Sequence, residues 1–255
     1  MALLAEHGPD AKVLAGGTDL IIRLRDGTYT PKVVVDVKRV REFEPSIQQR
    51  EGVLRISAGT TMTQIHDSDV INHWFPALAD AARYVGSVQI RNRATLVGNQ
   101  CNASPAADTA PPLLVYDARL VIAGPVGQRT VPLNDFFVRS GVTTLAAGEL
   151  VTAIELLRPS GRFGSAFQRR TRRRGHDLAS VTIAVVVDED GRLRLSYGSL
   201  GPRPLVFEGE EDEIETWLSA AAPSPHSMRA SPYYRLAMLR VLTGRALTSA
   251  RGQLA

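Results

Sequence analysis

The first forty residues alternate between short apolar runs and polar turns. Residues 12–15 and the β-branched run 33–37 predict two strands, the second of which follows Pro31. Between them, apolar residues at positions 20, 21, 22 and 24 predict a short helix that ends at Asp26-Gly27. The order of strand, turn, helix and strand predicts a small α/β unit.

The middle of the chain mixes both periodicities. Residues 53–58 alternate between apolar and polar and predict a half-buried strand. Helical spacing then runs over 62–85, and Pro76 is expected to break it into two helices. Residues 111–116 fit an apolar helix, while 113–122 and 129–133 fit a hairpin around Gly124-Pro125.

The pattern changes near Pro159-Ser160-Gly161. Three strands are predicted beyond this point, over 163–170, 180–187 and 192–199. Pro202 and Pro204 are expected to end the sheet, and two helices are predicted around 209–221 and 232–247. The whole pattern is therefore α+β and divides into two domains.

Composition excludes several classes of protein. The chain has 255 residues, of which 44% are hydrophobic and 22% charged, so a disordered chain is excluded. No apolar run is long enough for a membrane span and no secretory signal is visible, so a soluble, cytoplasmic protein is expected. The single Cys101 excludes a four-thiolate iron–sulfur cluster or a cysteine-rich zinc site in this chain. The five histidines show no metal-ligand spacing, so no metal site is expected.

The first candidate motif is the turn after the first predicted strand, from Val13 to Leu20. Its two consecutive glycines, Gly16 and Gly17, let backbone amides approach a ligand, and such an array before a helix suits a pyrophosphate. Thr18 would add a hydroxyl donor, and Asp19 would cap the helix. The alternative is a plain tight turn with a cap, because neither the Rossmann fingerprint nor the P-loop pattern is present.

The second candidate motif covers residues 89–108. It gathers amide, hydroxyl and guanidinium groups in a stretch with few apolar residues, which predicts a long polar loop. Polar loops of this length inside a compact domain usually serve a function. The alternative is a solvated connection.

The two motifs together resemble one family. Ala15-Gly-Gly-Thr-Asp-Leu20, Ile90-Arg-Asn-Arg-Ala-Thr-Leu-Val-Gly-Asn99 and Asn102-Ala-Ser-Pro-Ala-Ala-Asp108 are similar to the flavin subunits of molybdenum hydroxylases. That family includes the medium subunits of bacterial xanthine and carbon monoxide dehydrogenases. The resemblance extends over nearly the whole chain, through Gly59-Thr60-Thr61 to Ser231-Pro-Tyr-Tyr-Arg235.

The resemblance implies an architecture. Residues 1–158 would form an FAD-binding domain of the vanillyl-alcohol oxidase type, with two α/β subdomains at about 1–40 and 41–158. Residues 162–255 would form a C-terminal α+β domain of the carbon monoxide dehydrogenase flavoprotein type.

The resemblance also implies which residues bind FAD. The first motif would hold the pyrophosphate, residues 95–99 would contact the second phosphate and ribityl chain, and Asp108 would bind between adenosine and ribityl. Val85 and Ile90 would lie near the flavin ring. The full set is Val13, Leu14, Ala15, Gly16, Gly17, Thr18, Asp19, Leu20, Val85, Ile90, Thr95, Gly98, Asn99, Asp108 and Leu150. No residue of this chain is expected to act as a catalytic acid, base or nucleophile.

Two departures from the family bear on FAD affinity. Val97 stands where the family has glycine, and it would weaken FAD binding if the backbone there needs a positive φ or a close approach to the phosphate. Family members also begin earlier, so that Met1 falls within their first helix; either the start is truncated here or the first strand is absent.

Five arginines lie within the six residues that follow Gln168. A run of this kind is a candidate nucleic-acid patch, but the expected aromatic stacking platform is absent and the net charge is only +4. A solvated loop is the second interpretation. The resemblance supplies a third, in which the segment lies near the flavin and attracts an anionic acceptor such as NAD.

The preferred interpretation is an FAD-binding electron-transfer subunit. Substrate would react at a molybdopterin centre on a large partner chain, and [2Fe–2S] clusters on a small partner would pass electrons to this FAD and on to NAD or another acceptor. No nucleic acid or membrane partner is expected. The alternatives are a self-contained flavin oxidase of the related fold and a scaffold subunit that has lost FAD.

Overall fold

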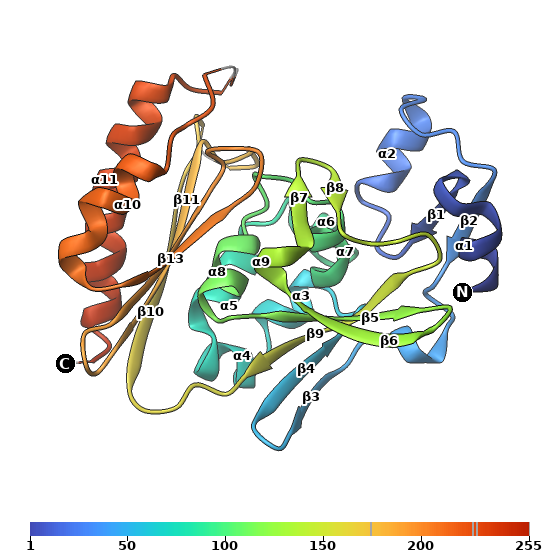
Figure 1. The fold of residues 1–255 in the computed structure, drawn as a ribbon, viewed down its shortest axis with the longest axis horizontal. Coiled ribbons are helices and arrows are strands. Elements are labelled where there is room, and N and C mark those ends of the chain that lie inside the picture. The colour runs from blue at the N-terminus through green and yellow to red at the C-terminus, as the bar shows by residue number, and fades with distance from the viewer. Residues whose placement is uncertain (174, 226, 228, 255) are drawn as a thin grey trace.

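A small parallel unit begins the chain. In the computed structural model, which describes residues 1–173, 175–225, 227 and 229–254, the first two strands pair in parallel and a short helix connects them (Figure 1). The elements are α1 (Ala2–His7), β1 (Ala11–Leu14), α2 (Leu20–Arg25) and β2 (Val33–Asp36). The predicted strand, helix and strand are confirmed.

A five-stranded antiparallel sheet forms the centre of the molecule. Its order is β3-β4-β9-β5-β6, so β9, late in the sequence, lies between strands from two earlier hairpins. The strands are β3 (Ile47–Arg50), β4 (Val53–Ser57), β5 (Arg119–Gly124), β6 (Gly127–Pro132) and β9 (Leu150–Leu157). Of these, β3 and β9 were not predicted.

Helices fill the segment between β4 and β5. Residues 62–83 form three helices instead of the expected two, because the chain also breaks between His66 and Asp69. The apolar helix predicted at 111–116 is confirmed as α8, because prolines suit a first helical turn. Asp117 adopts a positive φ that ends this helix, so the first strand of the hairpin starts only at Arg119. The helices are α3 (Met62–His66), α4 (Asp69–Trp74), α5 (Pro76–Arg83), α6 (Val88–Arg91), α7 (Leu96–Cys101) and α8 (Ala110–Val115).

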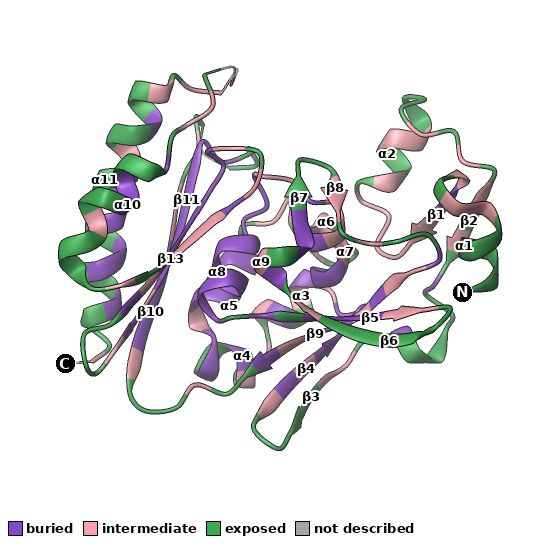
Figure 2. Cartoon of the chain, viewed as in Figure 1, coloured by how far each residue is buried: buried purple, intermediate pink, exposed green. Residues whose placement is uncertain are grey.

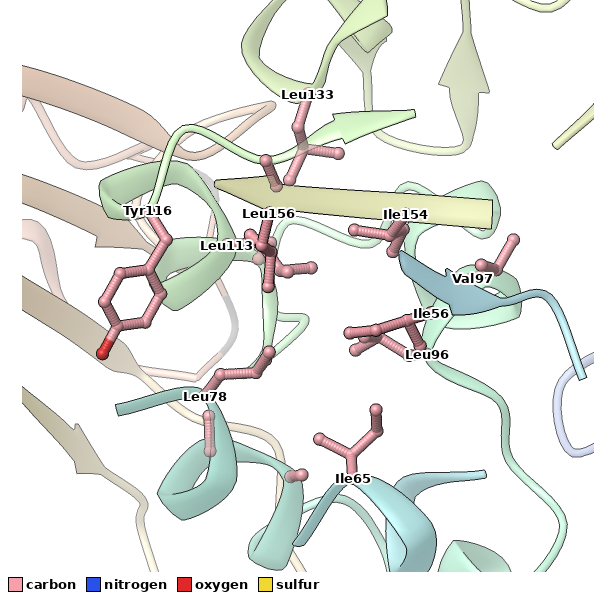
Figure 3. Close-up of a cluster of buried hydrophobic side chains, with 14 of the residues drawn as sticks. Ile56, Ile65, Leu78, Leu96, Val97, Leu113, Tyr116, Leu133, Ile154 and Leu156 are labelled. Atoms are coloured by element: carbon pink, nitrogen blue, oxygen red, sulfur yellow. The ribbon is translucent and has the colours of Figure 1, made fainter. Parts of the chain in front are cut away.

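These helices and the central sheet share one large apolar core. Figure 3 shows side chains from α3, α5, α7 and α8 gathered with those of β4 and β9, among them Ile65, Leu78, Leu113 and Ile154. The short elements α9 (Leu133–Phe136), β7 (Phe137–Arg139) and β8 (Val142–Thr143) follow the sheet's outer hairpin.

The C-terminal part is a second antiparallel sheet between two layers of helices. Helices α5 and α8 contact one face, and α11 packs on the other together with α10 (Figures 1 and 2). Alternation along β11 makes this possible, because Ile183 and Val185 join the core under α11 while Ala184 joins the large core. The elements are β10 (Phe163–Arg170), β11 (Val181–Asp188), β12 (Leu193–Gly198), β13 (Leu205–Gly209), α10 (Ile214–Ala220) and α11 (Pro232–Arg251).

Strand β13 corrects one expectation. Pro202 and Pro204 do not end the sheet, since β13 begins directly after Pro204 and pairs with β12. It is an edge strand, where a preceding proline removes no bond from the ladder. The architecture is thus a mixture of helices and antiparallel sheets, as the α+β class requires. In the described part of the chain, no helix has both the length and the apolar character of a membrane span.

The turn between β3 and β4 offers a test of backbone strain. Glu51 adopts a φ of 47° there, it is exposed, and Gly52 follows it. Asparagine tolerates this conformation better than glutamate, so we expect Glu51→Asn to raise the free energy of unfolding by about 0.5–1 kcal/mol. Urea titration measures the effect. Gln49→Asn, on the exposed part of β3, is the matched control and should give no gain.

Candidate functional site

The turn after β1 lies directly against the start of the second motif. A side chain at Gly16 would overlap the backbone carbonyl oxygen of Arg93, so only glycine allows this approach. Gly17 adopts a φ of 78°, which again favours glycine. Both glycines are therefore required by the local structure, and the first of them joins two segments that are far apart in sequence.

A third turn completes the arrangement. It follows β4 at Gly59-Thr60, and backbone hydrogen bonds hold it to the second motif. The N–H of Leu96 donates to the Thr60 carbonyl at 3.1 Å, and the N–H of Met62 donates to the Ala94 carbonyl at 2.8 Å. The three turns are thus fixed relative to one another by main-chain contacts.

The turns surround a cavity of about 180 Å³. It is smaller than the roughly 300–1,000 Å³ of a site that encloses a whole ligand, so it can take only part of a dinucleotide. Two basic residues line it. The ammonium of Lys38 is paired with Asp36 Oδ1 at 2.7 Å, whereas Arg93 forms no ion pair with the described residues and favours an anionic group. Its lining residues are Ala15, Gly16, Val37, Lys38, Phe43, Pro45, Gly59, Thr61, Asn92, Arg93 and Thr95. Of these, Ala15, Gly16 and Thr95 were predicted to bind FAD. The other eight were not: Val37, Lys38, Phe43, Pro45, Gly59, Thr61, Asn92 and Arg93.

Asp19 departs from its expected role. Although it precedes α2, its side chain makes no capping hydrogen bond with that helix. Its Oδ1 instead accepts a hydrogen bond from Nδ2 of Asn102 at 3.2 Å. Asp19 therefore links the first motif to the end of α7.

The second motif is not a long loop. Ser87 and Thr95 cap two short helices, α6 and α7, by accepting hydrogen bonds from the N–H groups of Ile90 and Gly98. Thr95 thereby lies at the cavity edge, while the N–H groups of Leu96 and Gly98 in the first turn of α7 already donate to the Thr60 carbonyl and to Thr95 Oγ1. The expected loop was wrong because two capping residues in a polar stretch suffice to start helices.

The side chain of Asn99 is held in place. Its Oδ1 accepts hydrogen bonds from Oγ1 of Thr109 at 2.7 Å and from Nε2 of Gln100 at 3.2 Å. These two hydrogen bonds fix the amide plane of Asn99, and they therefore also fix the direction of its Nδ2 group. A buried oxygen of Gln100, Oε1, has no hydrogen-bond partner among the described residues.

Val97 does not occupy the site. It lies inside α7 with no positive φ, and its side chain is 3% exposed and belongs to the large core, near Ile154 of β9 (Figure 3). The backbone conformation that would have penalised valine is therefore not adopted here.

Asp108 is a buried carboxylate at the end of the second motif. Its Oδ2 lies 3.3 Å from a guanidinium nitrogen of Arg169, and its Oδ1 is buried without a partner in the described part of the chain. Burial raises the pKa of Asp108 to about 7, and the positive charge of Arg169 opposes that rise.

Burial of Asp108 predicts a pH-dependent stability. Because its folded pKa lies above the unfolded value, the folded state binds more protons, and stability falls as pH rises from about 4 to 7. We expect the unfolding free energy of Asp108→Asn, relative to wild type, to gain on the order of 2 kcal/mol over this range. Denaturant titrations at pH 5 and 8 measure the difference. Asp190→Asn, in an exposed turn, controls for the change in net charge. If Asp108→Asn instead lost stability relative to wild type between pH 5 and pH 8, the positive charge of Arg169 would outweigh burial.

The remaining predicted residues, Val85, Ile90 and Leu150, are not among those that line the cavity. Val85 and Ile90 are neighbours across Gly86, where an added Cβ would lie 2.5 Å from the Ile90 side chain. Both pack against the large core. Leu150 begins β9 opposite Ala123 of β5 and is half-buried against the same core.

The arginine run divides into two parts. Arg169 is buried beside Asp108, a position that the sequence did not indicate. The others turn outward: Nε of Arg170 donates to the hydroxyl of Tyr234 at 3.0 Å, and Arg172 and Arg173 are exposed. Arg174 lies outside the described residues.

Comparisons with known proteins identify relatives along the whole chain. Residues 1–158 match the family model described as the FAD-binding domain in molybdopterin dehydrogenase. The xanthine dehydrogenase FAD-binding subunit of Escherichia coli O157:H7 is 33% identical, over 97% of this chain and 91% of that one. The nicotinate dehydrogenase FAD-subunit of Eubacterium barkeri is 35% identical, over 79% and 71%. Among solved structures, reconstituted CO dehydrogenase from Oligotropha carboxidovorans superimposes with a TM-score of 0.91 at 26% identity, over 99% and 93%.

Proposed function

Because this chain belongs to the family of FAD-binding medium subunits of molybdenum hydroxylases, we propose that it is the electron-transfer subunit of a larger complex. The chain is an FAD-binding oxidoreductase subunit. We further propose the vanillyl-alcohol oxidase type of fold for residues 1–158, with subdomains at about 1–40 and 41–158, and a separate C-terminal domain for 162–255. We propose a cytoplasmic location.

The observation that carries the proposal is the meeting of three turns at Gly16, Gly59 and Thr95. Residues 13–20 would hold the pyrophosphate, for which the turn's amides and the nearby guanidinium of Arg93 provide suitable donors. The backbone of this turn is already fixed by the close approach of Gly16 to Arg93. We therefore expect little conformational entropy to be lost when an anion binds.

Other predicted residues fit the rest of FAD. The oriented amide of Asn99 can donate to a phosphate or ribityl oxygen, and the unpartnered Oδ1 of Asp108 can accept a hydrogen bond from a hydroxyl. Val85 and Ile90 offer apolar surface for a flavin ring. We keep Leu150 as an outer contact in this proposal.

FAD, when bound, supplies hydride and one-electron transfer. The residues of this chain would bind it, orient it and exclude water from its phosphates. Cys101 is the single cysteine of the chain and is half-buried. Desolvation of its thiol raises its pKa to about 12, so it is not a reactive thiolate. The redox chemistry therefore belongs to the cofactor.

We propose two partner chains. One cysteine cannot hold an iron–sulfur cluster, so [2Fe–2S] clusters would lie on a small partner and the molybdopterin centre on a large one. Relatives named as FAD-binding subunits of xanthine and nicotinate dehydrogenases support this division. The acceptor would be NAD or another oxidant.

The exposed arginines give a test of the acceptor. If Arg172 and Arg173 attract an anionic acceptor, then R172Q/R173Q should lower kcat/KM for NAD about tenfold at low salt, because charge steering is lost. Activity with an uncharged dye should change little. Steady-state assays of the complex with both acceptors measure this, and equal losses with the two acceptors would contradict the assignment.

The proposed function is tested first by cofactor content. The purified chain should show a flavin absorption spectrum and release equimolar FAD on heating, and adding the two partners with substrate should bleach that spectrum. A colourless chain that takes up no added FAD would favour the scaffold alternative. Turnover of a substrate by the chain alone would favour the self-contained oxidase.

A further inference from the structure

The first arginine of the run has a different environment from its neighbours. The side chain of Arg169 is 10% exposed, whereas that of Arg172 is 55% exposed. A guanidinium buried to this extent needs local partners for its charge and hydrogen bonds. Both terminal nitrogens of Arg169 have them, whereas its Nε has none among the described residues. Arg169 is therefore an internal part of the structure, and only the following arginines belong to the charged surface.

Three separate segments contact its guanidinium group. One terminal nitrogen donates to the backbone carbonyl of Tyr84 at 3.1 Å and lies 3.3 Å from Oδ2 of Asp108. The other donates to the backbone carbonyl of Asp177 at 2.6 Å. The group also stacks on the ring of Tyr84, 5.3 Å from its centroid.

These contacts connect residues that belong to, or adjoin, the proposed FAD site. Tyr84 directly precedes Val85, Asp108 ends the second motif, and Asp177 ends the exposed arginine segment. Only a planar fork with several donors can contact two carbonyls, a carboxylate and an aromatic face together.

We propose that Arg169 is a positioning residue for FAD binding, which orients Asp108 and ties the segment of residues 171–178 to the cofactor site. The inference rests on the proposed contact between Asp108 and FAD. Arg169 acts through Asp108 and touches no part of FAD itself. Removing it leaves the carboxylate buried without a partner, so the carboxylate either protonates or turns away.

The experiment measures FAD affinity in a double-mutant cycle. R169M should weaken FAD binding by at least about tenfold, measured from flavin fluorescence at equilibrium, as expected when a buried charged hydrogen bond is lost. D108N should cause a comparable loss. In the D108N background, R169M should add little, because the residue through which it acts has been changed.

R158M is a matched control. The Arg158 guanidinium stacks on Trp74 at 5.0 Å, much as Arg169 stacks on Tyr84, but it lies at the end of β9. It should leave FAD affinity unchanged. R169K keeps the charge and loses the fork, so it should bind FAD with an affinity between those of wild type and R169M, and it serves if R169M does not fold.

Limited trypsin digestion of the FAD-free chain gives an independent measurement. Without the bond to the Asp177 carbonyl, R169K and R169M should be cleaved after Arg172 and Arg173 several-fold faster than wild type or R158M. Losses that multiply in the double variant, or unchanged FAD affinity and cleavage, would overturn the inference. Failure of the wild-type chain to bind FAD would instead refute the proposed function. The digestion would still report on the hydrogen bond between Arg169 and the Asp177 carbonyl.

Discussion

Gly16→Ala is expected to abolish the flavin spectrum of the purified chain. The added methyl group would overlap the carbonyl oxygen of Arg93. The backbone at Arg93 is held in place, because the next residue, Ala94, accepts a hydrogen bond from the N–H of Met62. The β1 turn must therefore move away from the second motif. We expect FAD affinity to fall at least about a hundredfold and the free energy of unfolding to fall by about 1–3 kcal/mol.

Gly244→Ala is the matched control. Gly244 lies in the middle of α11 with open space where a Cβ would be placed, so alanine should stabilise the helix by up to about 1 kcal/mol and leave FAD content unchanged. Absorption spectra and urea titrations of the two variants measure both effects. Normal FAD content in Gly16→Ala would contradict the assignment of the β1 turn to the pyrophosphate.

The sequence predicted those elements whose signals are local. The β1–α2–β2 unit and the hairpin of β11 and β12 have turns and apolar periods within a few residues, and they form as expected. Strand β9 was missed because its sequence does not alternate strictly. Ala153 and Ile154 are consecutive apolar residues that are both buried, while Thr152 and Glu155 are half-buried. Strand β13 was missed because a proline before an edge strand looks like the end of a sheet.

The site was predicted in its segments but not in its connections. The glycine turn and the residues from Thr95 to Asp108 were identified from composition and resemblance. The bond between Asp19 and Asn102 joins residues 83 apart, and no local pattern specifies it. The burial of Arg169 was likewise hidden, because in sequence it is one arginine among five, and only the approach of β10 to Asp108 distinguishes it.

Tyr116 connects the FAD-binding half of the chain to the C-terminal sheet. Its hydroxyl lies 2.6 Å from Oγ of Ser165 on β10 and accepts a hydrogen bond from the N–H of Ala77 at 3.2 Å. Gln253, beyond α11, forms hydrogen bonds with both backbone groups of Ser165. One buried hydroxyl, on the residue that follows α8, thus joins α5 to β10.

Tyr116→Phe should therefore be one of the costliest single-atom deletions in the molecule. It leaves the Ala77 N–H and the Ser165 hydroxyl buried without their partner, so we expect the free energy of unfolding to fall by about 2–3 kcal/mol. In that background Ser165→Ala should cost less than it does alone, because the unsatisfied hydroxyl is removed. Tyr233→Phe, on a side chain that is 85% exposed, should change stability by less than about 0.5 kcal/mol. Equal costs for the two tyrosine variants in urea titrations would show that this hydroxyl does not hold the two halves together.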